Sequence, residues 1–381
     1  MKNISILGST GSIGVNALNV IDNLTDKFNV KALSAYKNSN LLIEQAKKYR
    51  PDTIAIVDSS KAGFIRDSLK DCGVSVLHGR EGLLELASRS DVDIMFNSLV
   101  GSSGMQPTIN AIRSSVDIAL CNKESLVMAG DIIENEKNKS GAKIFPVDSE
   151  HSAIWQCLAG ENIDDVEKII LTGSGGPFRT RDINTFNDIN KEEALNHPNW
   201  SMGDKITIDS ATMMNKGLEV IETKWLFGVN VDKIKIIIHP ESIIHSMVEF
   251  KDKSVKAQLG VPDMKVPIQY ALTYPERYLG SWESLDLLQL GTLNFEPPDT
   301  KKFPCISLAY EALNKAGTMP TVLNVANEQA VYRFLNKEIG FMDIPYIIEK
   351  ACDKHDWVSN PCLDDLLHLE TWTTDFVKKF T

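Results

Sequence analysis

The chain has 381 residues, of which 43% are hydrophobic and 24% charged, and its formal net charge is -11 at pH 7. This length allows two or three domains with separate cores, and the acidic balance argues against a general nucleic-acid binder. The sequence enters a strand pattern at once, and no apolar run approaches the ~20 residues that span a bilayer. Six scattered cysteines without a C-x-x-C pair favour reduced thiols. We therefore expect a cytoplasmic protein without a membrane segment, a zinc cluster or a disulfide framework.

The first predicted strand, residues 4–7, runs into a glycine-rich turn and then into a helical pattern. The turn reads Gly8-Ser9-Thr10-Gly11-Ser12-Ile13-Gly14. Glycines let the backbone approach a pyrophosphate closely, and the helix start offers free N–H groups and the positive end of its dipole. The turn is therefore a candidate cofactor-binding site. The alternative is a tight strand-to-helix turn that binds nothing.

Strand-like and helix-like stretches then alternate. The strands are predicted at residues 30–33, 53–57, 74–77, 94–96 and 118–120, and amphipathic segments such as 41–49 separate them. Repeated strand–helix units indicate a parallel, doubly wound sheet. We therefore predict a Rossmann-like domain over residues 1–147.

The end of the second strand distinguishes between cofactors. NAD enzymes usually place an acidic residue there to hold the ribose 2′-hydroxyl. This chain has Ala35-Tyr36-Lys37-Asn38 instead. A lysine without an acid favours a 2′-phosphate and hence NADP, although an exposed lysine in a turn would look the same.

Further polar residues follow the later strands of this domain. Asn122, Lys123 and Glu124 come directly after the strand at 118–120. Ligands of open α/β sheets bind at the carboxyl ends of strands, so these residues are candidates for the edge shared by cofactor and substrate. Asn122 could alternatively cap the helix that begins there.

Two acids, Asp148 and Glu150, stand at the end of the apolar run 142–147. In an extended segment, residues i and i+2 project to the same side. Two carboxylates placed in this way repel one another unless a cation lies between them. The alternative is a solvated loop and helix cap.

The strand–helix alternation is lost after Glu150. A predicted strand at 166–171 is followed by a second glycine-rich turn that contains Ser174, which could hold a phosphate. The segment His197-Pro198-Asn199-Trp200-Ser201-Met202-Gly203 has loop character, and its Trp200 suggests a lid that excludes water. A flexible connection and a tryptophan packed on the core are the respective alternatives.

The segment from Asp209 to Glu222 has helical periodicity. Asn215 and Lys216 lie four and three residues before Glu219, so all three share one helix face. With Ser210 they form an anion-binding set, and Glu219 offers a third carboxylate beside Asp148 and Glu150. Three carboxylates form a hard-cation site suited to Mg²⁺ or Mn²⁺, while the absence of suitable Cys and His spacing argues against zinc.

The remainder divides into a supporting sheet and helices. Strand patterns at 236–250 and 254–259 complete a predicted α+β catalytic and dimerisation domain over residues 148–275. Residues 276–304 are predicted to form a linker. Helical patterns at 306–315, 322–335, 343–352 and 363–379 predict a C-terminal helical bundle over 305–381.

Taken in order, these motifs resemble the 1-deoxy-D-xylulose 5-phosphate reductoisomerase family over nearly the whole chain. The resemblance rests on the glycine-rich turn, on Asn122–Ser125, Pro146–His151, Leu171–Phe178, His197–Gly203 and Asp209–Glu219, and extends through Ile238–Met247 and Leu323–Glu328. It implies an NADPH- and divalent-metal-dependent homodimeric enzyme of the non-mevalonate isoprenoid pathway. Such an enzyme isomerises and reduces 1-deoxy-D-xylulose 5-phosphate to 2-C-methyl-D-erythritol 4-phosphate. The family usually has glycine where this chain has Tyr36.

The resemblance also implies roles for individual residues. Asp148, Glu150 and Glu219 would bind the metal and, with Lys123 and His197, form the catalytic set. The substrate would be held by Lys123, Ser149, Glu150, Ser174, His197, Trp200, Ser210, Asn215, Lys216 and Glu219. NADPH would be bound by residues 10–13, Lys37, Asn38, Asn122, Glu124 and Gly203. One competing hypothesis is another NADP-dependent dehydrogenase of a small phosphorylated or semialdehyde substrate, which would need Cys121 if it worked through a thiohemiacetal. Another is a non-catalytic NADP-binding sensor, which leaves the three carboxylates unexplained.

Overall fold

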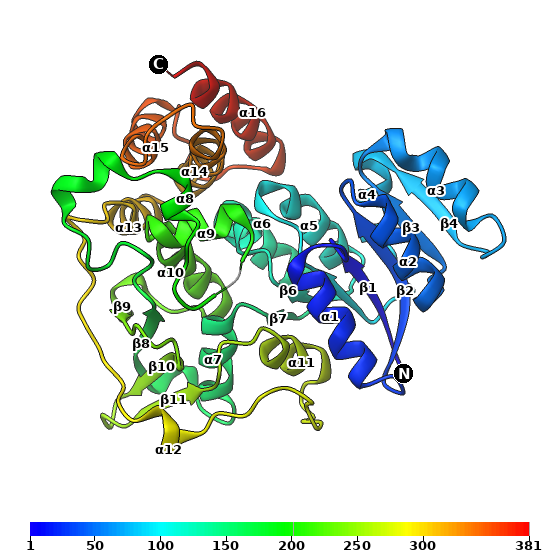
Figure 1. Ribbon diagram of the computed structural model, residues 1–381, viewed down its shortest axis with the longest axis horizontal. Coiled ribbons are helices and arrows are strands. Elements are labelled where there is room, and N and C mark those ends of the chain that lie inside the picture. Colours follow the sequence, from blue (N-terminus) through cyan, green and yellow to red (C-terminus); the bar gives the residue numbers. More distant parts are fainter. Residues whose placement is uncertain (201, 381) are drawn as a thin grey trace. The chain divides into compact units, whose positions relative to one another are not determined.

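The computed structural model describes residues 1–200 and 202–380 and divides into two compact units (Figure 1). The first unit contains residues Met1–Ser125, Asp131–Asp148 and Met264–Trp282. The second contains Leu126–Gly130, Ser149–Asp263 and Glu283–Thr381. Among the described residues, no helix is both long enough and apolar enough to cross a membrane.

A seven-stranded parallel sheet forms the centre of the first unit. Its order is β4-β3-β2-β1-β5-β6-β7. The strands are β1 (Lys2–Leu7), β2 (Phe28–Ala35), β3 (Thr53–Ile56), β4 (Ser75–His78), β5 (Ile94–Asn97), β6 (Asp117–Leu120) and β7 (Ile144–Pro146). The direction of winding reverses between β1 and β5, which pair directly. In sheets of this kind the reversal opens a crevice at the carboxyl ends of the strands, where ligands bind.

Helices connect these strands, and each helix buries its apolar face against the sheet. They are α1 (Ser12–Asn23), α2 (Ser39–Tyr49), α3 (Ala62–Leu69), α4 (Gly79–Ala87), α5 (Met105–Arg113) and α6 (Lys123–Ser140). A later helix, α11 (Lys265–Thr273), also belongs to this unit and packs on α1 and β7. Ile4, Ile6 and Phe96 are completely buried in the sheet, as expected for parallel strands covered on both faces.

The second unit is built on a four-stranded sheet of order β11-β10-β8-β9. Its strands are β8 (Val166–Gly173), β9 (Ile234–Ile238), β10 (Ile244–Phe250) and β11 (Val255–Leu259). Only the pairing of β8 with β9 is parallel among those described. β11 is an edge strand, and Val255 and Leu259 on it are exposed.

Helices cover this sheet and continue away from it. They are α7 (Ser149–Leu158), α8 (Lys191–Ala194), α9 (Asp204–Ala211), α10 (Met214–Phe227), α12 (Leu287–Leu290), α13 (Cys305–Lys315), α14 (Met319–Leu335), α15 (Asp343–Lys354) and α16 (Leu363–Lys379). In Figure 1, α10 lies between the four-stranded sheet and α13, and it packs on both. Leu218 and Ile221 of α10 belong to the same core as Ala309 and Val322. The helix that carries Lys216 and Glu219 is therefore fixed on two sides.

The predicted fold class is confirmed: a doubly wound parallel sheet, an α+β region and a helical C-terminal region are all present. The two compact units nevertheless have other boundaries than the predicted segments 1–147, 148–275, 276–304 and 305–381. Residues 283–381 join 149–263 in one unit, since α13 packs on α10. Residues 264–282 instead join the first unit through α11. The four-segment division remains a prediction.

Candidate active site

The glycine-rich turn after β1 opens directly into α1. Gly11 is the N-cap residue of α1 and offers no side chain to the first turn, so the N–H groups there are available to a ligand. Gly14 leaves no room for a side chain, because a Cβ there would lie 2.3 Å from the carbonyl oxygen of Gly8. The turn is thus pressed against the start of the helix, with Thr10, Ser12 and Ile13 around the helix N-terminus.

Residues Tyr36, Lys37 and Asn38 follow β2, the neighbour of β1. The side chains of Tyr36 and Lys37 are exposed, while Asn38 caps α2 by accepting a 3.3 Å hydrogen bond from the N–H of Leu41. Tyr36 is not among the residues with positive φ, so the backbone here accommodates a side chain in place of the family's usual glycine. The exposed side chain of Lys37 is therefore accessible to an anion at this end of the sheet.

Asn122 follows β6 and caps α6, accepting a 3.0 Å hydrogen bond from the N–H of Ser125. Its amide also donates to the carbonyl oxygens of Leu99 and Gly101, both at 2.9 Å, and to Glu124 at 3.1 Å. Asn122 thus joins the turn after β6 to the turn after β5. This agrees with the capping alternative considered from the sequence.

Lys123 and Asp148 form an ion pair at the same edge of the sheet. The ammonium nitrogen lies 2.5 Å from Asp148 Oδ2, and both side chains are largely withdrawn from solvent. Pairing is required because an isolated charge at this depth would lose its hydration without compensation. Lys123 and Asp148 therefore share one buried electrostatic environment.

The expectation that Asp148 and Glu150 project from one extended segment is wrong. β7 ends at Pro146, and α7 begins at Ser149, so Glu150 lies in the first turn of a helix. The alternation of side chains in a strand does not apply there. Ser149 donates a 2.6 Å hydrogen bond to Glu150 Oε2, which fixes the carboxylate at the start of α7.

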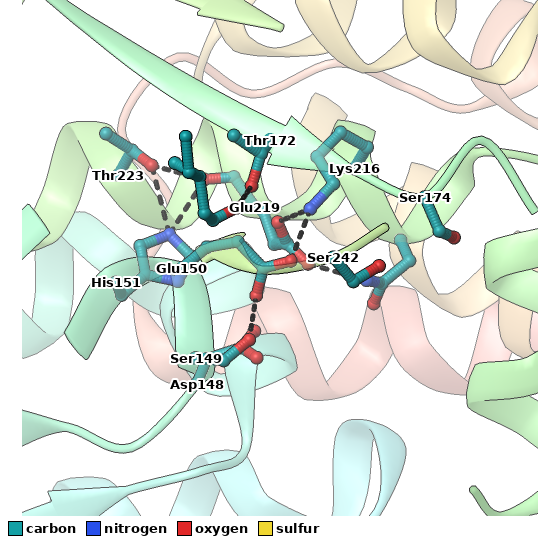
Figure 2. A network of polar contacts seen from close by, with 12 residues as sticks. Asp148, Ser149, Glu150, His151, Thr172, Ser174, Lys216, Glu219, Thr223 and Ser242 are labelled. Carbon is teal, nitrogen blue, oxygen red and sulfur yellow. Dashed lines mark hydrogen bonds and ion pairs between the residues drawn. The ribbon is translucent and has the colours of Figure 1, made fainter. Parts of the chain in front are cut away.

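Helix α10 brings Asn215, Lys216 and Glu219 to one face, as the spacing predicts. Figure 2 shows Lys216 and Glu219 of this set. Lys216 Nζ donates to Glu150 Oε1 at 2.7 Å and to Glu219 Oε2 at 2.5 Å, and Asn215 donates to Glu219 Oε1 at 2.5 Å. Glu219 is completely buried. Burial acts to lower the pKa of Lys216, but the charges of Glu150 and Glu219 outweigh it and hold the pKa above its usual value. The ammonium thus neutralises two acids that lie on different helices.

Beside this cluster, His151 links α7 to α10 (Figure 2). The hydroxyl of Thr223 donates to the carbonyl oxygen of Glu219 at 2.7 Å, and His151 Nε2 lies 3.0 Å from that hydroxyl oxygen and 3.1 Å from the same carbonyl. His151 Nδ1 is 3.2 Å from Glu222 Oε2. Sequence reasoning missed the roles of His151, Glu222 and Thr223. The only available signal was the position of His151 directly after Glu150.

Ser174 and His197 form a second polar pair. His197 Nδ1 accepts hydrogen bonds from the backbone N–H groups of Asn199 and Trp200 at 3.2 and 3.0 Å. Nδ1 therefore carries no proton, and the proton of the neutral ring is on Nε2, which donates to Ser174 Oγ at 3.1 Å. Burial lowers the pKa of His197 and so favours this neutral form.

The turn that carries Ser174 packs tightly on the end of α9. Gly176 has φ +68°, and a Cβ there would lie 2.6 Å from the carbonyl oxygen of Ser210. The N–H of Gly176 donates to Ser174 Oγ at 3.2 Å. His197 Nε2 and the N–H of Gly176 thus both donate to Ser174 Oγ and fill its two acceptor positions. The hydroxyl proton of Ser174 is therefore directed to another acceptor.

Trp200 lies near His245 of β10, with ring centroids 6.4 Å apart. Burial lowers the pKa of His245. Within the predicted lid segment, Ser201 lies outside the described residues, and Gly203 is the N-cap residue of α9. The described part of the segment thus connects the Ser174 turn, β10 and the start of α9.

Together, a glycine-rich turn at the reversal of a doubly wound sheet and a lysine without an acid after β2 define a dinucleotide-dependent oxidoreductase of the NADP type. The second unit adds carboxylates suited to a hard cation and hydroxyl and ammonium groups suited to an anion.

Comparisons with known proteins identify the family. Residues 4–130 match the model of 1-deoxy-D-xylulose 5-phosphate reductoisomerase, and residues 144–227 and 259–376 match two models of its C-terminal domains. The reductoisomerase of Chloroherpeton thalassium is 53% identical over 99% of this chain and 97% of its own length. That of Acetivibrio thermocellus is 52% identical over 100% and 99%. The chain belongs to the 1-deoxy-D-xylulose 5-phosphate reductoisomerase family, and the predicted resemblance is confirmed.

Solved structures agree with this membership. The enzyme from Zymomonas mobilis in complex with NADPH has a TM-score of 0.92 and 40% identity, covering 99% of this chain and 98% of its own. A reductoisomerase in complex with NADPH, fosmidomycin and magnesium has a TM-score of 0.94 and 39% identity, again covering 99% and 98%. The predicted class, an NADP-dependent oxidoreductase, is confirmed.

Proposed function

We propose that this chain converts 1-deoxy-D-xylulose 5-phosphate into 2-C-methyl-D-erythritol 4-phosphate, with NADPH and a divalent cation as cofactors. Family membership over the whole chain supports the reaction. The observation that carries the proposal is the joint presence of Glu150, Lys216 and Glu219 in one buried cluster. It offers a cation site and an anion-binding ammonium within one set of contacts.

The carboxylates fit a divalent metal. Glu150 and Glu219 each present an oxygen atom within 4.8 Å of the other, and hard cations such as Mg²⁺ and Mn²⁺ prefer such ligands. Asp148, two residues before Glu150 in the chain, is the proposed third ligand. When bound, the ion supplies Lewis-acid polarisation of the substrate's carbonyl and hydroxyl oxygens.

Hydroxyl and nitrogen donors would hold the phosphate. Ser174 is a pure donor toward a ligand, because His197 and Gly176 already donate to its oxygen. The remaining donors assigned to the phosphate and neighbouring hydroxyls are Ser210, Asn215 and Lys216, and Ser149 is assigned to the substrate as well. A neutral His197 donates its Nε2–H to Ser174 Oγ. This hydrogen bond orients the hydroxyl without adding a charge.

The cofactor is assigned to the carboxyl edge of the seven-stranded sheet. The start of α1 binds the pyrophosphate through backbone N–H groups of residues 10–13, and Lys37 meets the 2′-phosphate. Asn38, Asn122, Glu124 and Gly203 complete the assigned contacts. NADPH supplies a hydride to the aldehyde formed from the substrate.

The chemistry before reduction is a skeletal rearrangement, for which family chemistry suggests retro-aldol cleavage followed by re-addition. Both fragments must stay bound between these two events. Ser174 and His197 would anchor the phosphorylated fragment, and Trp200 would shield the site from water. Lys123, buried beside Asp148, would contact the reacting oxygens.

A homodimer in the cytoplasm completes the proposal. β11 ends the four-stranded sheet, and its exposed residues and unpaired backbone groups on one side suit pairing with a second copy of the chain. Sedimentation of the purified chain at twice the monomer mass would support this assembly, and a monomer at assay concentration would contradict it.

The reaction is tested by following NADPH absorbance after 1-deoxy-D-xylulose 5-phosphate is added to the purified chain with Mg²⁺ or Mn²⁺. We expect oxidation of NADPH that EDTA abolishes. Glu219→Gln should abolish turnover while NADPH affinity, measured by fluorescence titration, stays within about twofold, because the cofactor contacts lie elsewhere. Absence of turnover in the unmodified chain would refute the proposed reaction. Loss of NADPH binding in Glu219→Gln would contradict the assignment of Glu219 to the metal.

A further inference from the structure

The loop between β9 and β10, residues His239 to Ser242, is rigidly held. The backbone N–H of His239 donates to the carbonyl oxygen of Gly173 at 2.7 Å. Its buried ring accepts from the N–H of Ile243 at 3.2 Å and lies 2.9 Å from the carbonyl oxygen of Asn294. Ser242 has φ +56°, which is rare for a residue with a side chain. Such a backbone state persists only where its surroundings fix it, and it often marks a functional site.

Asn199 attaches the His197–Trp200 segment to this loop. Its amide nitrogen donates to the carbonyl oxygen of Pro240 at 2.6 Å and to Ser242 Oγ at 3.0 Å. Asn199 is otherwise exposed, so it contributes little to the hydrophobic core. Its two side-chain hydrogen bonds therefore act mainly on the position of its own segment.

The backbone of Asn199 also contacts His197, the residue that donates to Ser174. The backbone N–H of Asn199, with that of Trp200, donates to His197 Nδ1. This places the proton on Nε2, which donates to Ser174 Oγ. The side chain of Asn199 thus binds the loop, its backbone N–H binds His197, and His197 binds the hydroxyl of Ser174.

We propose that Asn199 is a positioning residue for recognition of the substrate's phosphate, acting through His197 and Ser174 while its amide is held by Pro240 and Ser242. This inference rests on the proposed function, which supplies the phosphorylated substrate. Asn199 makes no contact with the reacting atoms in this role. It fixes the tautomer and direction of His197, and these in turn direct the Ser174 hydroxyl proton toward the anion.

The proposal predicts a selective loss of substrate binding. Asn199→Asp keeps the size of the side chain and removes both N–H donors. Because two hydrogen bonds are each worth about 0.5–1.5 kcal/mol, we expect the KM for 1-deoxy-D-xylulose 5-phosphate to rise about tenfold. The kcat and the KM for NADPH should stay within about twofold. Ser242→Ala, which removes one acceptor, should raise the substrate KM by a smaller factor.

Asn196→Ala is the matched control, because Asn196 is an exposed asparagine three positions earlier whose side chain makes no hydrogen bond among the described residues. It should leave the kinetics unchanged. An unchanged substrate KM in Asn199→Asp, or an equal change in Asn196→Ala, would overturn the proposal.

A double-mutant cycle distinguishes positioning from a general structural role. If Asn199 acts through Ser174, then Asn199→Asp in a Ser174→Ala background should change kcat/KM by less than about twofold. A full tenfold loss in that background would show that Asn199 acts independently and would refute the proposed pathway. Absence of turnover in the unmodified chain is a separate result that refutes the proposed function itself, and this inference with it.

Discussion

Replacing Lys216 by methionine tests whether the acidic cluster is a cation site. Methionine keeps most of the buried length of the side chain but removes the ammonium that donates to Glu150 and Glu219. Two carboxylates from different helices are then left facing one another in a buried place. We expect Lys216→Met to destabilise the chain strongly when divalent metal is absent.

The magnitude follows from the geometry. Two unit charges 4.8 Å apart, the upper limit for these oxygens, repel by about 3.5 kcal/mol at an effective dielectric constant of about 20. This agrees with the ~3–5 kcal/mol measured when one partner of a buried ion pair is removed. A divalent cation at a hundred times its Kd returns about 2.7 kcal/mol by binding only the folded state. Magnesium should therefore restore most of the loss.

The assay is urea unfolding in EDTA and in saturating Mg²⁺, with Lys205→Met as the matched control. Lys205 is also buried and pairs with Asp209 at 2.7 Å, but it is not among the residues assigned to the metal. In EDTA we expect both variants to unfold at lower urea than the unmodified chain. Mg²⁺ should stabilise all three chains, because all three keep the carboxylates, but only in Lys216→Met should it reduce the difference from the unmodified chain. An equal reduction of this difference in the two variants, or no reduction in either, would refute the reasoning.

Three further outcomes are expected. Gly176→Ala should raise the substrate KM at least about tenfold and leave the Kd for NADPH unchanged, because a Cβ at φ +68° would lie 2.6 Å from the carbonyl oxygen of Ser210. Lys37→Ala should lower kcat/KM about tenfold or more with NADPH and little with NADH, since one charge-assisted hydrogen bond is worth about 1.5–3 kcal/mol. Burial lowers the pKa of His197, so the unfolded chain takes up a proton first as pH falls below about 6.5. The unfolding free energy lost between pH 7.5 and 5.5 should therefore be smaller in His197→Gln, as urea unfolding at the two pH values would show.

The parallel sheet was largely predictable because strands such as β3 and β5 are buried on both faces. The predicted strands at 53–57 and 94–96 became Thr53–Ile56 and Ile94–Asn97, and α16 has the predicted bounds. Continuous apolar runs between turn residues give this signal locally. The placement of α11 was not predictable in this way, because it depends on packing against α1, which lies more than 200 residues earlier.

In the candidate site, too, features that depend on local spacing were predictable, and features that depend on distant contacts were not. Asn215, Lys216 and Glu219 lie within one helix turn, so helical spacing alone placed them on one face, and their contacts confirm it. The conformation predicted at Glu150 was wrong because β7 ends at Pro146, one residue before the end of the apolar run, and a helix begins at Ser149. The roles of His151 and Asn199 depend on partners 41 to 72 residues away, and no local pattern reports such distances.

The position of Lys216 also explains how one residue can serve both a cation site and a phosphate. In the described structure the ammonium of Lys216 pairs with both Glu150 and Glu219 and offsets their charge at that depth. A divalent cation among the carboxylates would take over this neutralisation, and the ammonium would then be available to the anion. Metal and phosphorylated substrate should therefore bind with positive coupling through Lys216, and the coupling should be reciprocal. A cluster with a permanently free lysine would show no such dependence.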